Sequence, residues 1–223
     1  MKDMKVRIYK PENYKTSNWS GGRTIQTAIF PETANYAERN FLWRLSSATI
    51  ETEKSDFTSL PDYDRIIMVL SGEVVLVYEG DRVARLAELE QDRFDGALKT
   101  KSFGKITDYN LMYRKGSMGY MEALRVKLEK KVMQPEKVMW TAETAEFTEA
   151  EAVSAKMRRC DSMSEGYYCK EGYAVVSCGA ERHMIVAGEQ LVIDSKLAGR
   201  PEVSIAGVGV LVRTQVFFRG GIE

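Results

Sequence analysis

The chain has 223 residues, of which 44% are hydrophobic, and its 32 Lys and Arg residues are balanced by 32 Asp and Glu residues. This length and apolar share allow one large all-β domain or two small domains with a sizeable core. Because the charges balance and no basic block occurs, the sequence lacks the phosphate-neutralising surface that nucleic-acid binding requires, and no nucleic-acid partner is expected.

The apolar runs of the chain are of strand length. The longest, such as Ile66 to Leu70 and Val208 to Val212, are far shorter than a membrane span. The N-terminal residues MKDMKVRIYKPENY contain no apolar core, so they do not form a secretory signal. We therefore expect no membrane contact and a cytoplasmic location.

Two residue types that often carry catalysis are scarce. His183 is the only histidine, which excludes a multi-histidine metal centre, and its alternating surroundings favour an ordinary strand residue. The cysteines are Cys160, Cys169 and Cys178, an odd number without a C-x-x-C pair. This pattern is typical of reduced thiols, with a catalytic thiol as the weaker alternative. We expect neither a metal nor another cofactor.

In chain order, Lys5 to Tyr9 alternates as a first short strand, and Thr24 to Phe30 has the composition of a second. Gly21 and Gly22 precede the second strand. A glycine pair can hold an anion on its backbone amides, but neither a Lys-Ser/Thr pair nor a helix follows, so a tight turn is favoured. The polar stretch from Thr33 to Arg39 is expected to be a loop.

The stretch from Phe41 to Arg65 is the best place to look for function. Its strand places Leu42, Arg44, Ser46, Ala48 and Ile50 on one face, and Trp43, Leu45, Ser47 and Thr49 on the other. Both faces carry bulky apolar groups, so we expect the strand to be covered on both sides. Arg44 must then either pair with an internal carboxylate or be offered to a ligand, because an unpaired buried charge is costly.

Short strands continue beyond this stretch. Arg65 to Leu70, Glu73 to Tyr78 and Arg82 to Leu89 are separated by turns that contain glycine. Such regular spacing without long helices predicts an all-β sandwich or barrel. In a later strand, Asp108, Asn110 and Met112 share one face, so two polar groups point where a core methionine points.

The second half of the chain is β-rich again after an irregular middle. Alternation from Leu124 to Leu128 favours a strand over a helix. A capping box at Thr148 to Glu151 predicts a short connecting helix from about Glu149 to Arg159. We expect two β-rich halves, residues 1–134 and 135–223, or one fused compact unit.

Six short motifs occur in order through the first half. They are Trp19-Ser20-Gly21-Gly22-x-Thr24, Trp43-Arg44-Leu45-Ser46-x-Ala48, Phe57-Thr58-x-x-Pro61-x-x-Asp64-Arg65, Gly72, Phe94-x-Gly96 and Asp108-x-Asn110-x-Met112-x-Arg114. Together they resemble the HutD/Ves family, and the set is far more specific than any one motif. Residues Ala187 to Asp194 add a weaker match. Thr58 and Asp62 stand where the family usually shows Ser and Gly.

The resemblance implies a bicupin, with two RmlC-like jelly-roll β-barrels in one chain, the first over residues 1–134 and a smaller one over 135–223. Many cupins hold a metal through three histidines and a glutamate, and this chain has one histidine. The family is associated with histidine utilisation in bacteria. The resemblance therefore implies a metal-free regulator of histidine utilisation that binds a small carboxylated metabolite, with formyl- or formimino-glutamate derivatives as candidates.

Eight residues on candidate inward faces of the first barrel are expected to bind that ligand: Thr24, Arg44, Ser46, Asp64, Arg65, Asp108, Asn110 and Met112. Arg44 would hold a carboxylate bidentately, and Arg65 would take a second carboxylate or steer entry. The short polar side chains suit an amide or formyl oxygen, and Asp108 suits a cationic formimino nitrogen.

A structural role is the alternative for the same residues. In that case Arg44 pairs internally with Asp108 or Asp64, while Trp19 and Trp43 fill the core. We expect the glycines of the motifs, together with Trp19, to serve structure in either case.

Two other functions remain open. A metal-free isomerase, epimerase or lyase would use Asp64 or Asp108 as base and Tyr63, Tyr109 or Tyr113 as acid, although such chemistry generally relies on a histidine base. A scaffold module would fill its barrel with its own side chains. Since cupins often dimerise, a homodimer is a further expectation from the resemblance.

Overall fold

The computed structural model describes residues 4–128, 131–133 and 159–221, whose regular structure is almost entirely β-strand. One 3-10 turn at Pro11–Asn13 is the exception within these ranges. The all-β class is confirmed. Most of the helix expected from about Glu149 to Arg159 lies outside the described residues, and Arg159 itself is in a turn. None of the described segments is a helix with the length and apolarity needed to cross a membrane.

Contacts divide the chain into two compact units. The N-terminal unit is Tyr9–Lys115, and the C-terminal unit combines Met1–Ile8 with Gly116–Glu223. This division differs from the expected boundary at 134/135. The reason is strand pairing, because β12 (Met118–Val126) pairs with β17 (Val203–Phe218) and β1 (Met4–Tyr9) neighbours a C-terminal strand.

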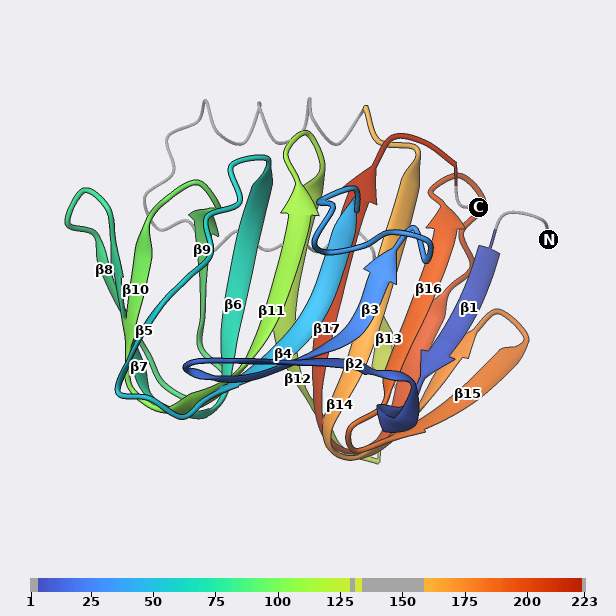
Figure 1. Ribbon diagram of the computed structural model, residues 1–223. Helices are drawn as coiled ribbons and strands as arrows, with labels where there is room; N and C mark the ends of the chain where they lie inside the picture. The colour runs from blue at the N-terminus through green and yellow to red at the C-terminus, as the bar shows by residue number, and fades with distance from the viewer. Residues whose placement is uncertain (1–3, 129–130, 134–158, 222–223) are drawn as a thin grey trace, which may run out of the picture. The chain divides into compact units, whose positions relative to one another are not determined.

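The N-terminal unit contains two antiparallel sheets (Figure 1). In spatial order, the six-stranded sheet consists of β2 (Lys15–Trp19), β3 (Gly22–Phe30), β4 (Trp43–Ile50), β11 (Ile106–Arg114), β6 (Tyr63–Gly72) and β9 (Gln91–Asp95). The four-stranded sheet consists of β5 (Lys54–Asp56), β10 (Thr100–Phe103), β7 (Val74–Tyr78) and β8 (Val83–Leu86). The strands expected from the alternating patterns of this half are therefore present.

The centre of the six-stranded sheet is formed by β4, β11 and β6. Arg44 on β4 lies opposite Met112 on β11, and Met112 lies opposite Arg65 on β6. Directly paired residues of antiparallel strands share one face, so these three side chains form a row. Further pairs on this face of β4 and β11 include Ser46 with Asn110 and Ala48 with Asp108. Pairing thus gathers polar groups that are distant in sequence.

The opposite face of β4 carries the buried apolar residues Trp43 and Leu45. Trp43 is 1% exposed, and its ring stacks on Phe30 with centroids 5.7 Å apart. On the Arg44 side of the sheet, the ring of Phe41 stacks on Tyr63 at 4.2 Å in a cluster with Met112, and the Tyr63 hydroxyl donates to the Phe41 carbonyl at 3.0 Å. The expectation that Trp43 walls the face opposite Arg44 is confirmed. Packing of this kind holds the strand that carries the arginine in place.

Two motif glycines are required by the backbone. Gly22 has φ +153°, and a Cβ there would lie 2.0 Å from the Thr49 carbonyl oxygen. Gly72, at the end of β6, has φ +87°, and its Cβ would lie 2.6 Å from the Lys105 carbonyl oxygen. Side chains are strongly disfavoured in such positions. The structural role expected for these glycines is confirmed.

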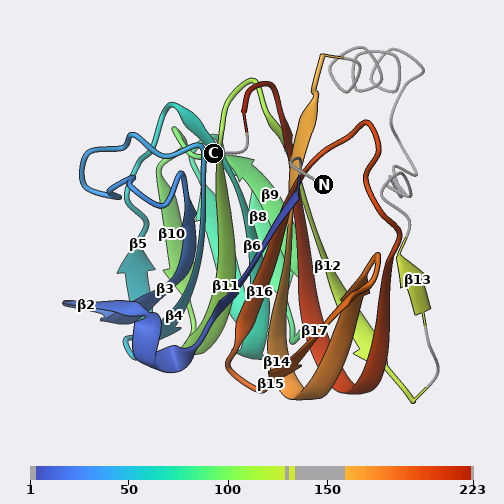
Figure 2. The same ribbon diagram turned by 90° about the vertical axis from the view of Figure 1, so that its right-hand side faces the viewer.

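The C-terminal unit is built on one seven-stranded sheet. Its spatial order is β1, β16 (Gln190–Lys196), β14 (Ser162–Cys178), β17 and β12, with β15 (Glu181–Val186) on β14 and β13 (Lys131–Met133) on β17. The long β14 and β17 run side by side (Figure 2). β17 runs without interruption from Val203 to Phe218.

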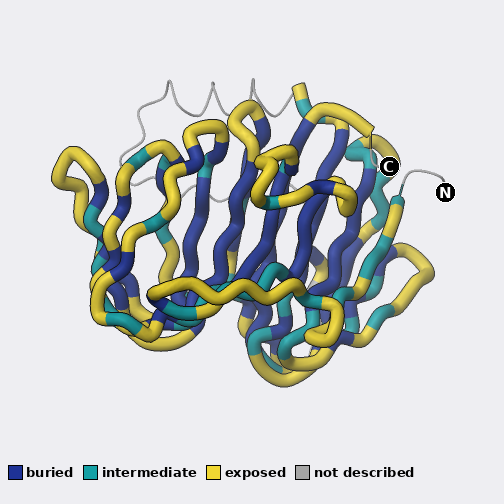
Figure 3. The backbone as a smooth tube through the Cα atoms, viewed as in Figure 1, coloured by how far each residue is buried: buried dark blue, intermediate teal, exposed yellow. Residues whose placement is uncertain are grey.

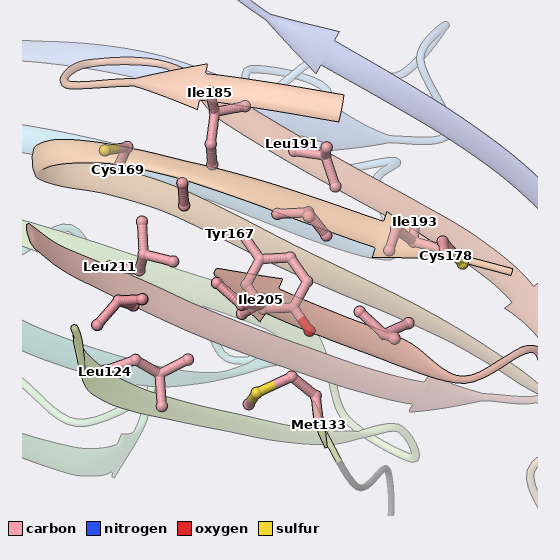
Figure 4. Close-up of a cluster of buried hydrophobic side chains, with 14 residues drawn as sticks. Leu124, Met133, Tyr167, Cys169, Cys178, Ile185, Leu191, Ile193, Ile205 and Leu211 are labelled. Carbon is pink, nitrogen blue, oxygen red and sulfur yellow. The ribbon is translucent and has the colours of Figure 1, made fainter. Parts of the chain in front are cut away.

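The core of the C-terminal unit lies mainly on β14, β16 and β17 (Figure 4). Tyr167, Leu191 and Ile193 are fully buried there. Cys169 and Cys178 are buried in the same cluster and are free, and burial raises the pKa of each thiol to about 11. Thiols held protonated in this way suit packing rather than nucleophilic catalysis.

Candidate functional site

Most of the expected site residues meet in a cavity of the N-terminal unit with a volume of about 280 Å³. Seven of the eight line it, namely Thr24, Arg44, Ser46, Arg65, Asp108, Asn110 and Met112. They reach it from β3, β4, β6 and β11. Asp64 does not line the cavity, because consecutive strand residues point to opposite faces and Asp64 directly precedes Arg65.

Arg44 is 5% exposed and is held by neighbours from within the unit. Its Nε donates to Gln26 Oε1 at 2.8 Å, and its Nη1 donates to Ser46 Oγ at 3.0 Å. The Tyr36 ring lies against the guanidinium, with its centroid 4.4 Å from Cζ, in a cation–π contact. Burial lowers the pKa of Arg44 to about 10, with Arg65 adding to the effect, so the group is still charged at neutral pH.

Arg65 is 6% exposed and is less well supplied with hydrogen bonds. Its Nη1 lies 3.4 Å from the Thr58 carbonyl oxygen, and its Nε has no hydrogen-bond partner. The guanidinium carbon lies 4.9 Å from the Phe57 ring centroid and 5.1 Å from that of Phe94. Burial lowers the pKa of Arg65, because a desolvated charge is disfavoured.

Neither guanidinium forms an ion pair with a residue that the structure describes. Across the described ranges, no carboxylate lies within ion-pair distance of Arg44 or Arg65. The structural alternative in which Arg44 pairs with Asp108 or Asp64 is therefore not what the structure shows. Two buried positive charges that share one cavity favour the entry of an anion.

Asp108 is the acidic group of the cavity and is 3% exposed. Its Oδ1 accepts a hydrogen bond from the Ala48 amide at 3.1 Å. Burial raises the pKa of Asp108 to about 7, against the opposing effects of that amide and of the positive charges of Arg65 and Arg44. Both protonation states of this carboxyl are thus populated near neutral pH.

Asn110 and Thr24 complete the polar lining. Asn110 is 4% exposed, and its Oδ1 has no hydrogen-bond partner. Thr24 Oγ1 accepts a hydrogen bond from Trp19 Nε1 at 3.2 Å. An unsatisfied buried acceptor is costly unless a ligand or water supplies a donor.

Trp19 is placed differently from the expectation that it fills the core. It is 37% exposed, and its ring lines the cavity. The physical reason is that β2 is an edge strand, exposed along its whole length (Figure 3). The structural alternative gave both Trp19 and Trp43 a core role, and the structure shows it for Trp43 and not for Trp19.

Several lining or supporting residues were missed by the sequence analysis. Among them are Tyr36 and Gln26, which contact Arg44, and Phe57, which contacts Arg65. Tyr36 is the only aromatic residue in the polar stretch from Thr33 to Arg39, and that isolation was the signal available. Gln26 lies two residues after Thr24 and opposite Ser46, so the alternation of β3 already places it on the face of Arg44, and that was the signal available for it.

The donor set of the cavity does not suit a metal. Its charged lining is two arginines and the acidic residues Asp56 and Asp108. Throughout the described ranges, no three His, Cys, Asp or Glu side chains come together in a way that could hold a metal ion. His183 lies on β15, where its Nε2 is 3.1 Å from Glu181 Oε2.

Comparison with known proteins gives a family and a fold. The HutD family model matches residues 11–166 of this chain. PA5104 from Pseudomonas aeruginosa PAO1, a conserved protein of unknown function, superimposes with a TM-score of 0.72 at 19% identity, covering 97% of this chain and 100% of the other. HutD from Pseudomonas fluorescens SBW25, in a formate condition, gives a TM-score of 0.66 at 20% identity, covering 97% and 100%.

A more distant solved structure, YhhW from Escherichia coli, gives a TM-score of 0.63 at 11% identity, covering 98% of this chain and 100% of the other. Another structure of YhhW describes it as a bacterial pirin in complex with nickel(II). Identities this low show a shared fold and nothing about ligands. No curated protein matches the chain.

Proposed function

Because this chain belongs to the HutD family, we propose that it is a histidine-utilisation protein whose N-terminal cavity binds a small carboxylated metabolite and that it acts as a metal-free regulator. The candidate ligands are formyl- or formimino-glutamate derivatives. The observation that carries this proposal is the presence of two buried arginines, Arg44 and Arg65, that line one cavity without an ion-pair partner in the described chain.

The cavity suits a ligand of amino-acid size. Its volume of about 280 Å³ lies near the lower end of the roughly 300–1,000 Å³ that small-molecule sites span. A filled interior would have favoured a scaffold module. A hollow, polar-lined space supports binding instead.

The guanidinium of Arg44 is oriented but not saturated. Gln26 accepts from Nε, Ser46 Oγ and Met112 Sδ accept from Nη1, and Nη2 has no hydrogen bond within the described chain. A carboxylate can therefore bond Nη2, and by replacing the weak Met112 Sδ acceptor on Nη1 it would form the two parallel bonds that a planar guanidinium favours. In our proposal Arg65 takes the second carboxylate through the Nε that lacks a protein partner.

The remaining polar groups give the ligand its orientation. Asn110 Oδ1, buried and without a donor, accepts from an amide N–H of the ligand. Met112, between the two arginines in the sheet, supplies an apolar floor for a short methylene chain.

The fold-level part of the proposal is a bicupin. Two β-rich units and structural similarity to a bacterial pirin support two RmlC-like jelly-roll barrels in one chain. We place the protein in the cytoplasm, without nucleic-acid or membrane partners, and propose a homodimer as its state of assembly.

One observation favours a second candidate function, a metal-free isomerase, epimerase or lyase. The pKa of Asp108, raised by burial to about 7, suits a general base. Tyr63, Tyr109 and Tyr113, the expected acids, are buried and do not line the cavity, so Tyr36 is the tyrosine that is placed for this role. Turnover of a bound glutamate derivative that Asp108→Asn abolishes would establish this function.

The experiment that tests the primary proposal is calorimetric titration with N-formylglutamate, formiminoglutamate, urocanate, histidine and glutamate. We expect saturable binding of at least one dicarboxylate by the wild type and none by Arg44→Ala. Arg85→Ala, which removes an exposed arginine of the same unit, is the matched control and should bind normally. No heat from any compound would contradict the proposal.

A further inference from the structure

One carboxyl oxygen of Asp108 forms a hydrogen bond within the protein, and the other does not. Oδ1 accepts from the Ala48 amide at 3.1 Å. Within the described chain, Oδ2 has no hydrogen bond, although the residue is 3% exposed and lines the cavity. A buried carboxyl in this state either keeps a proton, which makes Oδ2 a donor, or meets a cation, which makes it an acceptor.

The charged and titratable groups that share the cavity with Asp108 come from four elements. Arg44 lies on β4, Arg65 on β6, Asp56 on β5 and Tyr36 on the segment between β3 and β4. Asp56 is exposed, so the buried charges are the two guanidiniums and Asp108. With Asp108 protonated the buried charge is two positive, and with Asp108 ionised it is one positive.

These two states match two ligands that differ in one group. A dicarboxylate with a neutral N-acyl end carries two negative charges and complements the protonated site, where Oδ2 donates to its carbonyl oxygen. A dicarboxylate with an amidinium end carries one net negative charge and complements the ionised site, where Oδ2 accepts from the cationic nitrogen. We propose that the protonation state of Asp108 determines which of these two ligand classes binds. The protonated residue favours a neutral nitrogen end of the ligand, and the ionised residue favours a cationic one.

This inference rests on the proposed function, since it concerns the ligand of the same cavity. It is consistent with the pKa of Asp108, which burial raises to about 7. Binding of the acyl ligand then takes up a proton, so its affinity falls as the pH rises above about 7. Binding of the amidinium ligand releases a proton, so its affinity falls as the pH drops below about 7.

The test is a pair of calorimetric titrations, N-formyl-L-glutamate and N-formimino-L-glutamate, at pH 6 and pH 8. Because the apparent affinity scales with the fraction of the competent protonation state, each affinity should change by roughly tenfold, in opposite directions. The ratio of the two affinities should therefore change by roughly 100-fold in the wild type. In Asp108→Asn the ratio should not depend on pH.

A ratio that stays constant between pH 6 and pH 8 in the wild type overturns this inference and leaves the proposed function intact. The same ratio change in Asp108→Asn as in the wild type also overturns it, since another group would be responsible. If neither ligand binds, the proposed function fails along with it. Should the variant not fold, wild-type titrations in phosphate and in Tris count the protons directly, and equal proton uptake for both ligands overturns the inference.

Discussion

Buried arginines occur in both units, but their hydrogen-bond partners differ. Arg44 of the N-terminal unit and Arg213 of the C-terminal unit are 5% and 4% exposed. Arg213 bonds Glu165 through Nε at 2.6 Å and Glu122 through Nη1 at 2.8 Å, and Arg200 bonds the same Glu165. Arg44 has no carboxylate partner among the described residues. A buried arginine with a paired carboxylate holds the fold, whereas one left without it is available to a ligand.

The contrast extends to the row across each sheet. In the C-terminal unit, Arg213 lies opposite Tyr167 and Glu122. In the N-terminal unit, the row contains two arginines separated by Met112. The row in the C-terminal unit contains a carboxylate that balances its arginine. The row in the N-terminal unit contains none, so a ligand would have to supply the negative charge.

The largest effect is expected from Glu165→Ala. It leaves Arg200 without its carboxylate and Arg213 with the half-exposed Glu122 alone, so we expect a loss of about 3–5 kcal/mol in the free energy of unfolding. Urea unfolding followed by circular dichroism measures it. Glu181→Ala, an exposed control on β15, should cost no more than about 0.5 kcal/mol. A similar small loss in both variants would contradict the claim that the buried ion pairs of Glu165 stabilise the C-terminal unit.

Arg44→Lys is expected to weaken ligand binding by roughly 10- to 100-fold, because hydrogen bonds to charged groups contribute about 1.5–3 kcal/mol and lysine lacks the planar fork. Retention of charge makes this variant a test of geometry. Calorimetry with N-formylglutamate gives the change. Unaltered affinity would show that the site uses only the positive charge of Arg44.

The raised pKa of Asp108 predicts that the free energy of unfolding depends on pH. Since burial raises its pKa from 3.8 to about 7, the folded state binds more protons than the unfolded state between those values. The free energy of unfolding therefore decreases as the pH rises from about 4 to about 7, by at most ~1.4 kcal/mol per pH unit. Asp108→Asn should remove this slope. Equal slopes in the wild type and the variant, from urea unfolding at several pH values, would contradict the assignment.

The smallest effect is expected from Arg65→Met in the unliganded protein. Replacing a buried charge without a carboxylate partner by an apolar group of similar length should stabilise the fold by roughly 1 kcal/mol or more. Thermal unfolding without ligand checks this. The paired Arg213→Met should instead destabilise, since it leaves Glu165 with less compensation. Destabilisation of similar size by both changes would remove the distinction between the units.

The strands and one inward face could be predicted from the sequence because strand side chains alternate strictly. Arg44, Ser46 and Ala48 were assigned to one face on that ground, and all three line the cavity. Trp19 was misplaced because alternation does not tell an edge strand from a central one.

Features set by long-range pairing could not be predicted. The Glu165–Arg213 pair depends on the register between β14 and β17, and Arg200 reaches Glu165 from a segment beyond β16. The unit to which β12 belongs depends likewise on its pairing with β17. Local pattern carries no information on such contacts.

The most direct test of the central claim is ligand-induced stabilisation. At about 100 times its dissociation constant, N-formylglutamate should stabilise the wild type and Arg85→Ala by about 2.7 kcal/mol. Arg44→Ala should fold as well as the wild type and gain nothing from the ligand. Stabilisation of Arg44→Ala equal to that of the wild type would show that the buried arginine is not kept for an anionic ligand.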